Sequence, residues 1–149
     1  MKNYHLPWLL CLTWVCLLPV ESQGQNWHQF RGPGSRGVSA NDALPLKWDY
    51  GKRTNIEWEV ETQGRGWSSP IVTDGKIYYS TVVNEGATEA AKKGLYFGGN
   101  RAAPPKGVHH WLIICRDLTT GKLEWKKEVH HGIPSGSIHV KNSFASETA

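Results

Sequence analysis

The dipeptide Asp74-Gly75 constrains the fold more than any other feature, because it separates two runs of residues that favour β-strands. The first run covers residues 70–73 and the second covers 76–83, and both contain mainly Ile, Val, Thr and Tyr. An Asp-Gly pair fits a two-residue type I′ turn, in which both central residues need a positive φ. We therefore predict a β-hairpin with its turn at Asp74 and Gly75.

A second hairpin is predicted where the run 111–116 is followed by the turn 117–121 and by a returning strand over 123–129. Gly121 can supply the left-handed residue that closes a longer turn with a bulge. The carboxylate of Asp117 can accept hydrogen bonds from the turn backbone. Two hairpins give four strands, and the chain after residue 24 shows almost no helical periodicity, so the sequence predicts an all-β fold.

The two strands of this second hairpin differ in polarity. Residues 111–115 are apolar on both alternating faces, a pattern typical of a strand buried between two packed sheets. We expect Cys115, at the end of this run, to be a small buried apolar residue. In the returning strand, apolar Leu123, Trp125 and Val129 alternate with charged residues. This pattern predicts an outer strand with its apolar residues on one face and a second face in water.

Residues 1–22 have the layout of a secretory signal peptide, with a charged Lys2, an apolar stretch over 6–20 and a small residue, Ser22, at the exit. The apolar stretch holds 15 residues. A membrane-spanning helix needs about 20. A retained anchor, or cleavage after Gly24, are the alternatives. We expect cleavage after Ser22, which predicts a secreted or periplasmic protein with no transmembrane span after signal cleavage.

The rest of the chain divides into an irregular N-terminal segment at 23–50 and a strand-rich region at 51–149. Within that region, residues 84–110 are rich in Gly, Ala and Pro, and we interpret them as an insertion loop. The formal net charge is +4, and the cations are scattered among acidic residues instead of forming a stripe that could follow phosphates. We therefore do not expect nucleic acid as a partner.

A short internal repeat is visible on both sides of the insertion loop. Segments 55–60 and 121–126 share an apolar-Glu-Trp element, and segments 67–69 and 144–146 share an aromatic-small-Ser element. This order is expected where four-stranded units recur along a chain. A β-propeller has typically about four to eight such units, or blades, and this chain would supply about one and a half of them. We therefore expect a partial propeller, the N-terminal piece of a longer one.

The residues of the second turn resemble the pyrroloquinoline-quinone-like (PQQ-like) repeat, whose hallmark is Asp-x-x-Thr-Gly-x-x-x-Trp. The fixed positions of that hallmark match Asp117, Thr120, Gly121 and Trp125. The resemblance implies a propeller of four-stranded antiparallel blades in which the hallmark tryptophan docks against the neighbouring blade. Further matching stretches are 67–72 and the Asp74-Gly75 turn with 76–78, and stretches 27–33 and 94–99 are similar to a secreted bacterial branch of the family.

The resemblance implies two alternative functions. The first is a non-catalytic scaffold of the bacterial cell envelope that binds other envelope proteins, similar to propellers that assist outer-membrane assembly. The alternative is the N-terminal part of a PQQ- and calcium-dependent dehydrogenase that oxidises an alcohol or a sugar. Alcohol dehydrogenases of that group generally carry a disulfide between adjacent cysteines, whereas Cys115 is alone once Cys11 and Cys16 leave with the signal peptide. We therefore expect a scaffold with no cofactor and no catalytic or cofactor-binding residues.

Histidines flank the second hairpin and are the candidates for a metal site. Adjacent histidines on a strand point to opposite faces, so each pair offers one ligand to any single site. No Cys, Asp or Glu at ligand spacing completes a tetrahedral set in the sequence. We therefore expect solvated histidines at the rim and no metal. The five candidates are His109, His110, His130, His131 and His139.

Overall fold

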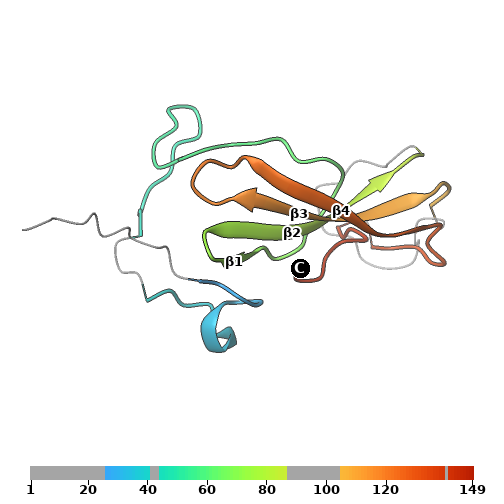
Figure 1. The fold of residues 1–149 in the computed structure, drawn as a ribbon, viewed down its shortest axis with the longest axis horizontal. Coiled ribbons are helices and arrows are strands. Elements are labelled where there is room, and N and C mark those ends of the chain that lie inside the picture. Colours follow the sequence, from blue (N-terminus) through green and yellow to red (C-terminus); the bar gives the residue numbers. More distant parts are fainter. Residues whose placement is uncertain (1–25, 41–43, 87–104, 140) are drawn as a thin grey trace, which may run out of the picture.

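A computed structural model describes residues 26–40, 44–86, 105–139 and 141–149. Within these ranges the protein is all-β, as predicted, with one four-stranded antiparallel sheet in the order β1-β2-β3-β4 (Figure 1). The predicted signal peptide at 1–22 and most of the insertion loop at 84–110 lie outside the described residues. The elements are the short 3-10 helix η1 (Pro33–Ser35) and the strands β1 (Ile71–Thr73), β2 (Lys76–Asn84), β3 (His109–Asp117) and β4 (Leu123–Gly132).

The Asp74-Gly75 hairpin is confirmed. Strands β1 and β2 are joined directly by these two residues, with Thr73 opposite Lys76. The backbone φ is 50° at Asp74 and 71° at Gly75, so both central positions have the positive φ that the Asp-Gly pair predicts. A local signal of two residues therefore set this turn.

The second turn is also confirmed, and it lies beside the first. Gly121 has a φ of 69°, and Oδ1 of Asp117 accepts hydrogen bonds from the backbone N–H and the hydroxyl of Thr120, both at 2.7 Å. The backbone N–H of Leu118 donates to the carbonyl oxygen of Gly75 at 2.9 Å. The two turns are thus joined at one end of the sheet, on the left of Figure 1.

Strand β3 contains most of the buried core, but the prediction that it lies between two packed sheets is wrong. The described residues form one sheet, and irregular segments contact its strands instead of a second sheet. The hydroxyl of Thr81 donates to the carbonyl oxygen of Gln63 at 2.8 Å, and Nε1 of Trp111 donates to that of Phe144 at 2.8 Å. Cys115 is 0 % exposed and has a free thiol, which confirms it as a small buried residue.

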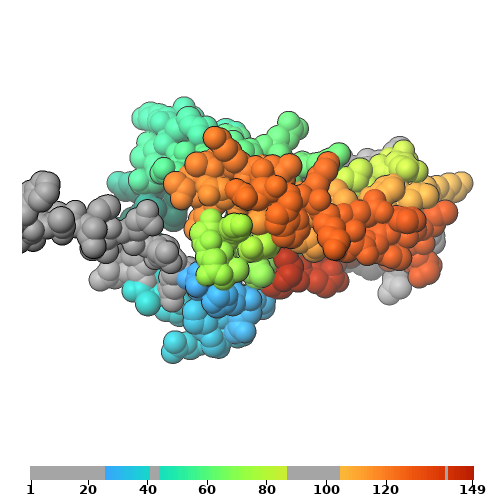
Figure 2. Space-filling view, in the orientation of Figure 1, coloured from blue at the N-terminus to red at the C-terminus, as the bar shows by residue number. Residues whose placement is uncertain are grey.

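Strand β4 is the outer strand, as predicted, but its apolar residues do not share a face. A register shift at Cys115/Arg116 places Trp125 opposite Cys115 and Leu123 opposite Arg116. Because adjacent residues of β3 point to opposite faces, Leu123 and Trp125 do as well. Every residue from Leu123 to His131 is exposed, and Figure 2 shows the orange surface of this hairpin in full view.

Irregular segments also border the free edge of β1. Trp27 pairs with Val72 of β1. Arg65 pairs with Val82 of β2, on the side of β2 that faces β1 but beyond the end of that short strand. The backbone N–H of Trp67 donates to the carbonyl oxygen of Ala145 at 2.9 Å, which brings the two aromatic-small-Ser segments together. Segment 55–60, which contains the first apolar-Glu-Trp element, forms no strand pairing with the described residues. Across the described ranges, no helix has the length and apolar character to cross a membrane.

Candidate functional site

The Asp117 turn supports a tryptophan that comes from a distant part of the chain. Nε1 of Trp58 donates a hydrogen bond to the carbonyl oxygen of Leu118 at 2.7 Å. The ring also covers Gly121 so closely that a Cβ at this glycine would lie 2.7 Å from the ring atoms Cδ2 and Cε3. Position 121 therefore requires a glycine for two reasons: the backbone has a positive φ, and the ring of Trp58 leaves no space for a Cβ.

Hydrogen bonds within the turn over residues 117–121 stabilise this platform, the surface on which Trp58 packs. The hydroxyl of Thr120, and then its backbone N–H, donate to Asp117 and keep the pKa of that carboxyl below its ordinary value. Nη1 of Arg116 donates to the carbonyl oxygen of Gly121 at 3.0 Å. Of the predicted motif residues, the structure brings together Asp74, Gly75, Asp117, Thr120 and Gly121 at this end of the sheet.

Trp125, the last residue of the hallmark, lies away from this platform. It is 42 % exposed, and its ring lies 5.9 Å from that of Tyr78 between centroids. In the internal repeat Trp125 occupies the place of Trp58, since each ends an apolar-Glu-Trp element. The two tryptophans therefore differ in surroundings: Trp58 covers a turn glycine, whereas Trp125 presents much of its ring at the surface.

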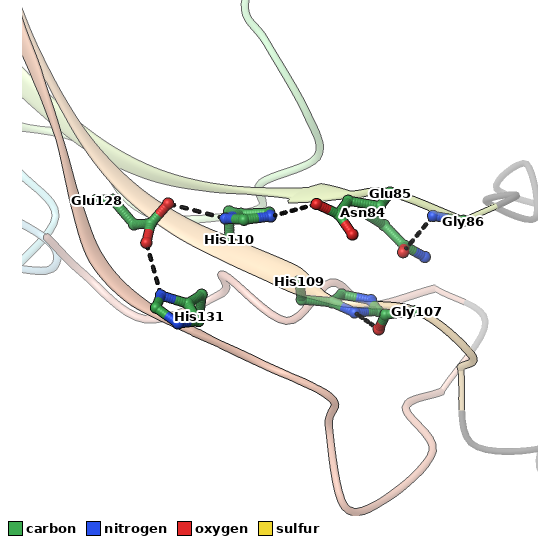
Figure 3. A network of polar contacts seen from close by, with 8 residues as sticks. All are labelled: Asn84, Glu85, Gly86, Gly107, His109, His110, Glu128 and His131. Atoms are coloured by element: carbon green, nitrogen blue, oxygen red, sulfur yellow. Dashed lines mark hydrogen bonds and ion pairs between the residues drawn. The ribbon is translucent and has the colours of Figure 1, made fainter.

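A second cluster of polar side chains lies at the opposite end of the sheet (Figure 3). The ring of His110 lies between two carboxylates, with Nδ1 2.8 Å from Oε2 of Glu128 and Nε2 3.1 Å from Oε1 of Glu85. The other oxygen of Glu128, Oε1, lies 2.8 Å from Nδ1 of His131. His110 and His131 are direct partners in the pairing of β3 with β4, which explains why they face each other.

The electrostatic consequences follow from these contacts. Hydrogen bonds to Glu128 and then to Glu85 raise the pKa of His110 above its ordinary 6.5. Hydrogen bonds from His110 and then from His131 lower the pKa of Glu128 below its ordinary 4.5. The histidine and the carboxylate therefore favour each other's charged form.

The other candidate histidines do not join this cluster. His109 is 2 % exposed, so the prediction of a solvated residue is wrong for it. It packs against the ring of Phe144 at 5.2 Å, and its Nδ1 lies 3.1 Å from the carbonyl oxygen of Gly107. His130 is exposed and lies against the ring of Trp111 at 4.9 Å, on the opposite face from His131. His139 is exposed and accepts a hydrogen bond from the backbone of Lys141.

Sequence reasoning missed both acidic members of the cluster. Glu128 is three residues before His131 and eighteen after His110, and Glu85 is 25 residues before His110. Only the pairing of β2, β3 and β4 brings them together. Among the residues described, no three His, Cys, Asp or Glu side chains are arranged to hold a metal ion.

Comparisons with known proteins give no match for this chain, whether with protein-family models, with curated proteins or with solved structures.

Proposed function

We propose that this chain belongs to a non-catalytic β-propeller repeat protein of the bacterial cell envelope, which serves as a scaffold for binding or assembling other envelope proteins. The proposal rests on the hallmark residues Asp117, Thr120, Gly121 and Trp125, which suit repeated units that lock onto one another. A four-stranded antiparallel sheet is the unit that such a propeller repeats. Secretion or periplasmic localisation, through the signal peptide at 1–22, is part of the same proposal.

The observation that carries the proposal is the contact between Trp58 and the second turn. Trp58 precedes the sheet by thirteen residues, since β1 begins at Ile71. It belongs to no strand of this sheet, and yet its indole covers Gly121 and bonds to Leu118. This is the contact expected if the apolar-Glu-Trp segment of one unit places its tryptophan on the turn of the next unit.

Trp125 extends the same argument to a further unit. It occupies the equivalent position of the repeat, and 42 % of its surface is exposed. An exposed tryptophan on an outer strand suits a residue that docks against another turn of the Asp-x-x-Thr-Gly type. In this proposal Trp125 would bond and pack on such a turn as Trp58 does on the turn at Gly121.

The coding sequence beyond codon 149 tests the propeller. We expect the frame to continue with more turns of the Asp-x-x-Thr-Gly-x-x-x-Trp form. In the product of that frame, Trp125→Ala should lower the melting temperature, because the docked ring is lost. Trp48→Ala is the matched control, since Trp48 is 66 % exposed and lies outside the repeat element. A frame without further turns, or equal effects of the two substitutions, would contradict the propeller.

Two binding measurements separate a scaffold from a dehydrogenase. The product of the whole frame is titrated with periplasmic components of the outer-membrane β-barrel assembly machinery, and separately with PQQ in the presence of calcium. The scaffold predicts saturable binding to an assembly component and none to the quinone. Saturable, calcium-dependent quinone binding without any protein partner would favour the dehydrogenase and overturn the scaffold.

A further inference from the structure

The cluster around His110 links the ends of three strands by a continuous chain of Glu and His side chains (Figure 3). Glu85 follows the last residue of β2, His110 is near the start of β3, and Glu128 and His131 are near the end of β4. The order of contacts is Glu85, His110, Glu128 and His131, with donor-acceptor distances of 3.1, 2.8 and 2.8 Å. The chain therefore crosses the sheet at right angles to its strands.

The number of protons in this chain is set by its geometry. A neutral imidazole has one N–H donor, whereas both ring nitrogens of His110 face carboxylate oxygens. An ionised carboxylate accepts hydrogen bonds but donates none, so both contacts of His110 are satisfied only when the ring is doubly protonated. An ionised Glu128 can accept a hydrogen bond at each oxygen, from His110 and from His131 when the latter carries its proton on Nδ1.

Other charged side chains among the described residues lie near the cluster or on the same strand. Lys126 is on the same face of β4 as Glu128, but its Nζ donates to Oε1 of Gln63 at 3.0 Å. The carbonyl oxygen of Lys106 approaches Gly86, so Lys106 lies beside Glu85, at one end of the cluster. On β4, Lys127 and His130 belong to the opposite face. The side chain of His110 is 28 % exposed, so its charge is more sheltered than that of a free surface histidine.

We propose that Glu85, His110, Glu128 and His131 form a pH-dependent clamp, which ties the ends of β2, β3 and β4 together in mild acid and loosens as His110 loses its proton. Once His110 has lost a proton, the ring keeps one N–H and can donate to only one of its two carboxylates. At the other contact, a ring nitrogen without a proton then faces a carboxylate oxygen, and two acceptors cannot form a hydrogen bond. The link between β2 and β4 through His110 therefore breaks. The backbone bond from Glu85 to Val108, at 3.1 Å, lies beside that link.

The direction of each pKa change agrees with this clamp. The pKa of His110 is raised in the folded protein. The contribution of His110 to stability is therefore complete below pH 6.5 and is lost as the pH rises through the pKa of the folded protein. The pKa of Glu128 is lowered in the folded protein. The contribution of Glu128 to stability is therefore complete above pH 4.5 and is lost as the pH falls through the pKa of the folded protein. The clamp is therefore fully closed between these two ordinary values.

The test is an NMR titration of the full chain with ¹⁵N-labelled histidine rings, from about pH 4.5 to about pH 8. At about pH 5.5 we expect both ring nitrogens of His110 to be protonated. Glu128→Gln should lower the pH at which His110 loses its proton, because the main hydrogen-bond acceptor loses its charge. Glu124→Gln is the matched control, since Glu124 is in the same strand but outside the clamp.

Each outcome of the titration decides for or against the clamp. A His110 ring that is neutral at about pH 5.5 in the unsubstituted protein would overturn it without any variant, so the test does not depend on how well the variant folds. Equal titration of His110 in Glu128→Gln and Glu124→Gln would overturn it as well. A lower midpoint in Glu128→Gln alone supports it.

Discussion

The two ends of the sheet are held by different kinds of interaction. At the turn end, Gly75 and Gly121 have positive φ values of 71° and 69°, and Trp58 packs on the second of them. At the histidine end, Glu128 joins His110 to His131 through charged hydrogen bonds. Backbone conformation and packing at the first end do not change with pH near neutrality, whereas the ion pairs at the second do.

This difference between the two ends indicates which end of the sheet can respond to a change of pH. The turn end fixes how β1, β2, β3 and β4 are connected, because both hairpin turns lie there and bond to each other through Leu118 and Gly75. The histidine end joins the far ends of strands that the turns have already placed. Changes at the turn end should therefore cost more stability, and changes at the histidine end should depend more on pH.

The largest effect is expected for Gly121→Ala. A Cβ at this position needs an unfavourable left-handed conformation, which costs about 1 to 2 kcal/mol. It also meets the ring of Trp58 at 2.7 Å, and such overpacking costs about 1 to 3 kcal/mol more. We expect a loss of about 2 to 5 kcal/mol in the free energy of unfolding, measured by urea denaturation of the full chain.

A double-mutant cycle separates the two causes of this loss. In a Trp58→Ala background the ring is gone, so Gly121→Ala should cost only the conformational part, about 1 to 2 kcal/mol. If the cost of Gly121→Ala is the same with and without Trp58, the ring does not pack on this glycine in solution, and the turn end loses the contact that distinguishes it.

Gly75→Ala should have the next largest effect. The φ of Gly75 is close to that of Gly121, but a Cβ there would have no atom within 4 Å. Only the conformational cost of about 1 to 2 kcal/mol applies, measured in the same urea experiment. Gly75→Asn is the control, because Asn tolerates the left-handed region better and should lose less. A loss as large as that of Gly121→Ala would contradict the packing difference between the turns.

Trp58→Phe is expected to cost about 1 kcal/mol, because it keeps a ring over Gly121 but removes the N–H that donates to Leu118. Thermal unfolding of the full chain measures it against Trp48→Phe, a change at a tryptophan that is mostly exposed. Equal melting temperatures for the two variants would show that the 2.7 Å hydrogen bond adds nothing to the turn end.

The turn end could be predicted from the sequence because its signals are local. Asp74-Gly75 and the residues from Asp117 to Gly121 each specify a turn within two to five positions, and their φ angles agree with that prediction. The burial of Cys115 followed from an apolar run of the same length. Such features depend on neighbours in the chain, so composition and spacing are enough to predict them.

The histidine end could not be predicted in the same way. Its cluster depends on the register of β2, β3 and β4, and a register shift at Cys115/Arg116 breaks the simple alternation that placed Leu123 and Trp125 on one face. The partner of Trp58 was missed for a related reason, because 60 residues separate it from Leu118. Periodicity within one strand contains no information on contacts of this range.

The smallest expected effect, and the one with the sharpest pH dependence, belongs to His110→Gln. Glutamine is neutral at all pH values, so the variant lacks the charged link between Glu85 and Glu128. The difference in melting temperature from the unsubstituted protein should be greatest between 4.5 and 6.5, the ordinary pKa values of glutamate and histidine, and should shrink above the raised pKa of His110. Gly75→Ala is the control, and its difference should stay level over this range. A His110→Gln difference that is equally level would mean that both ends of the sheet are held independently of pH, and the comparison between them would fail.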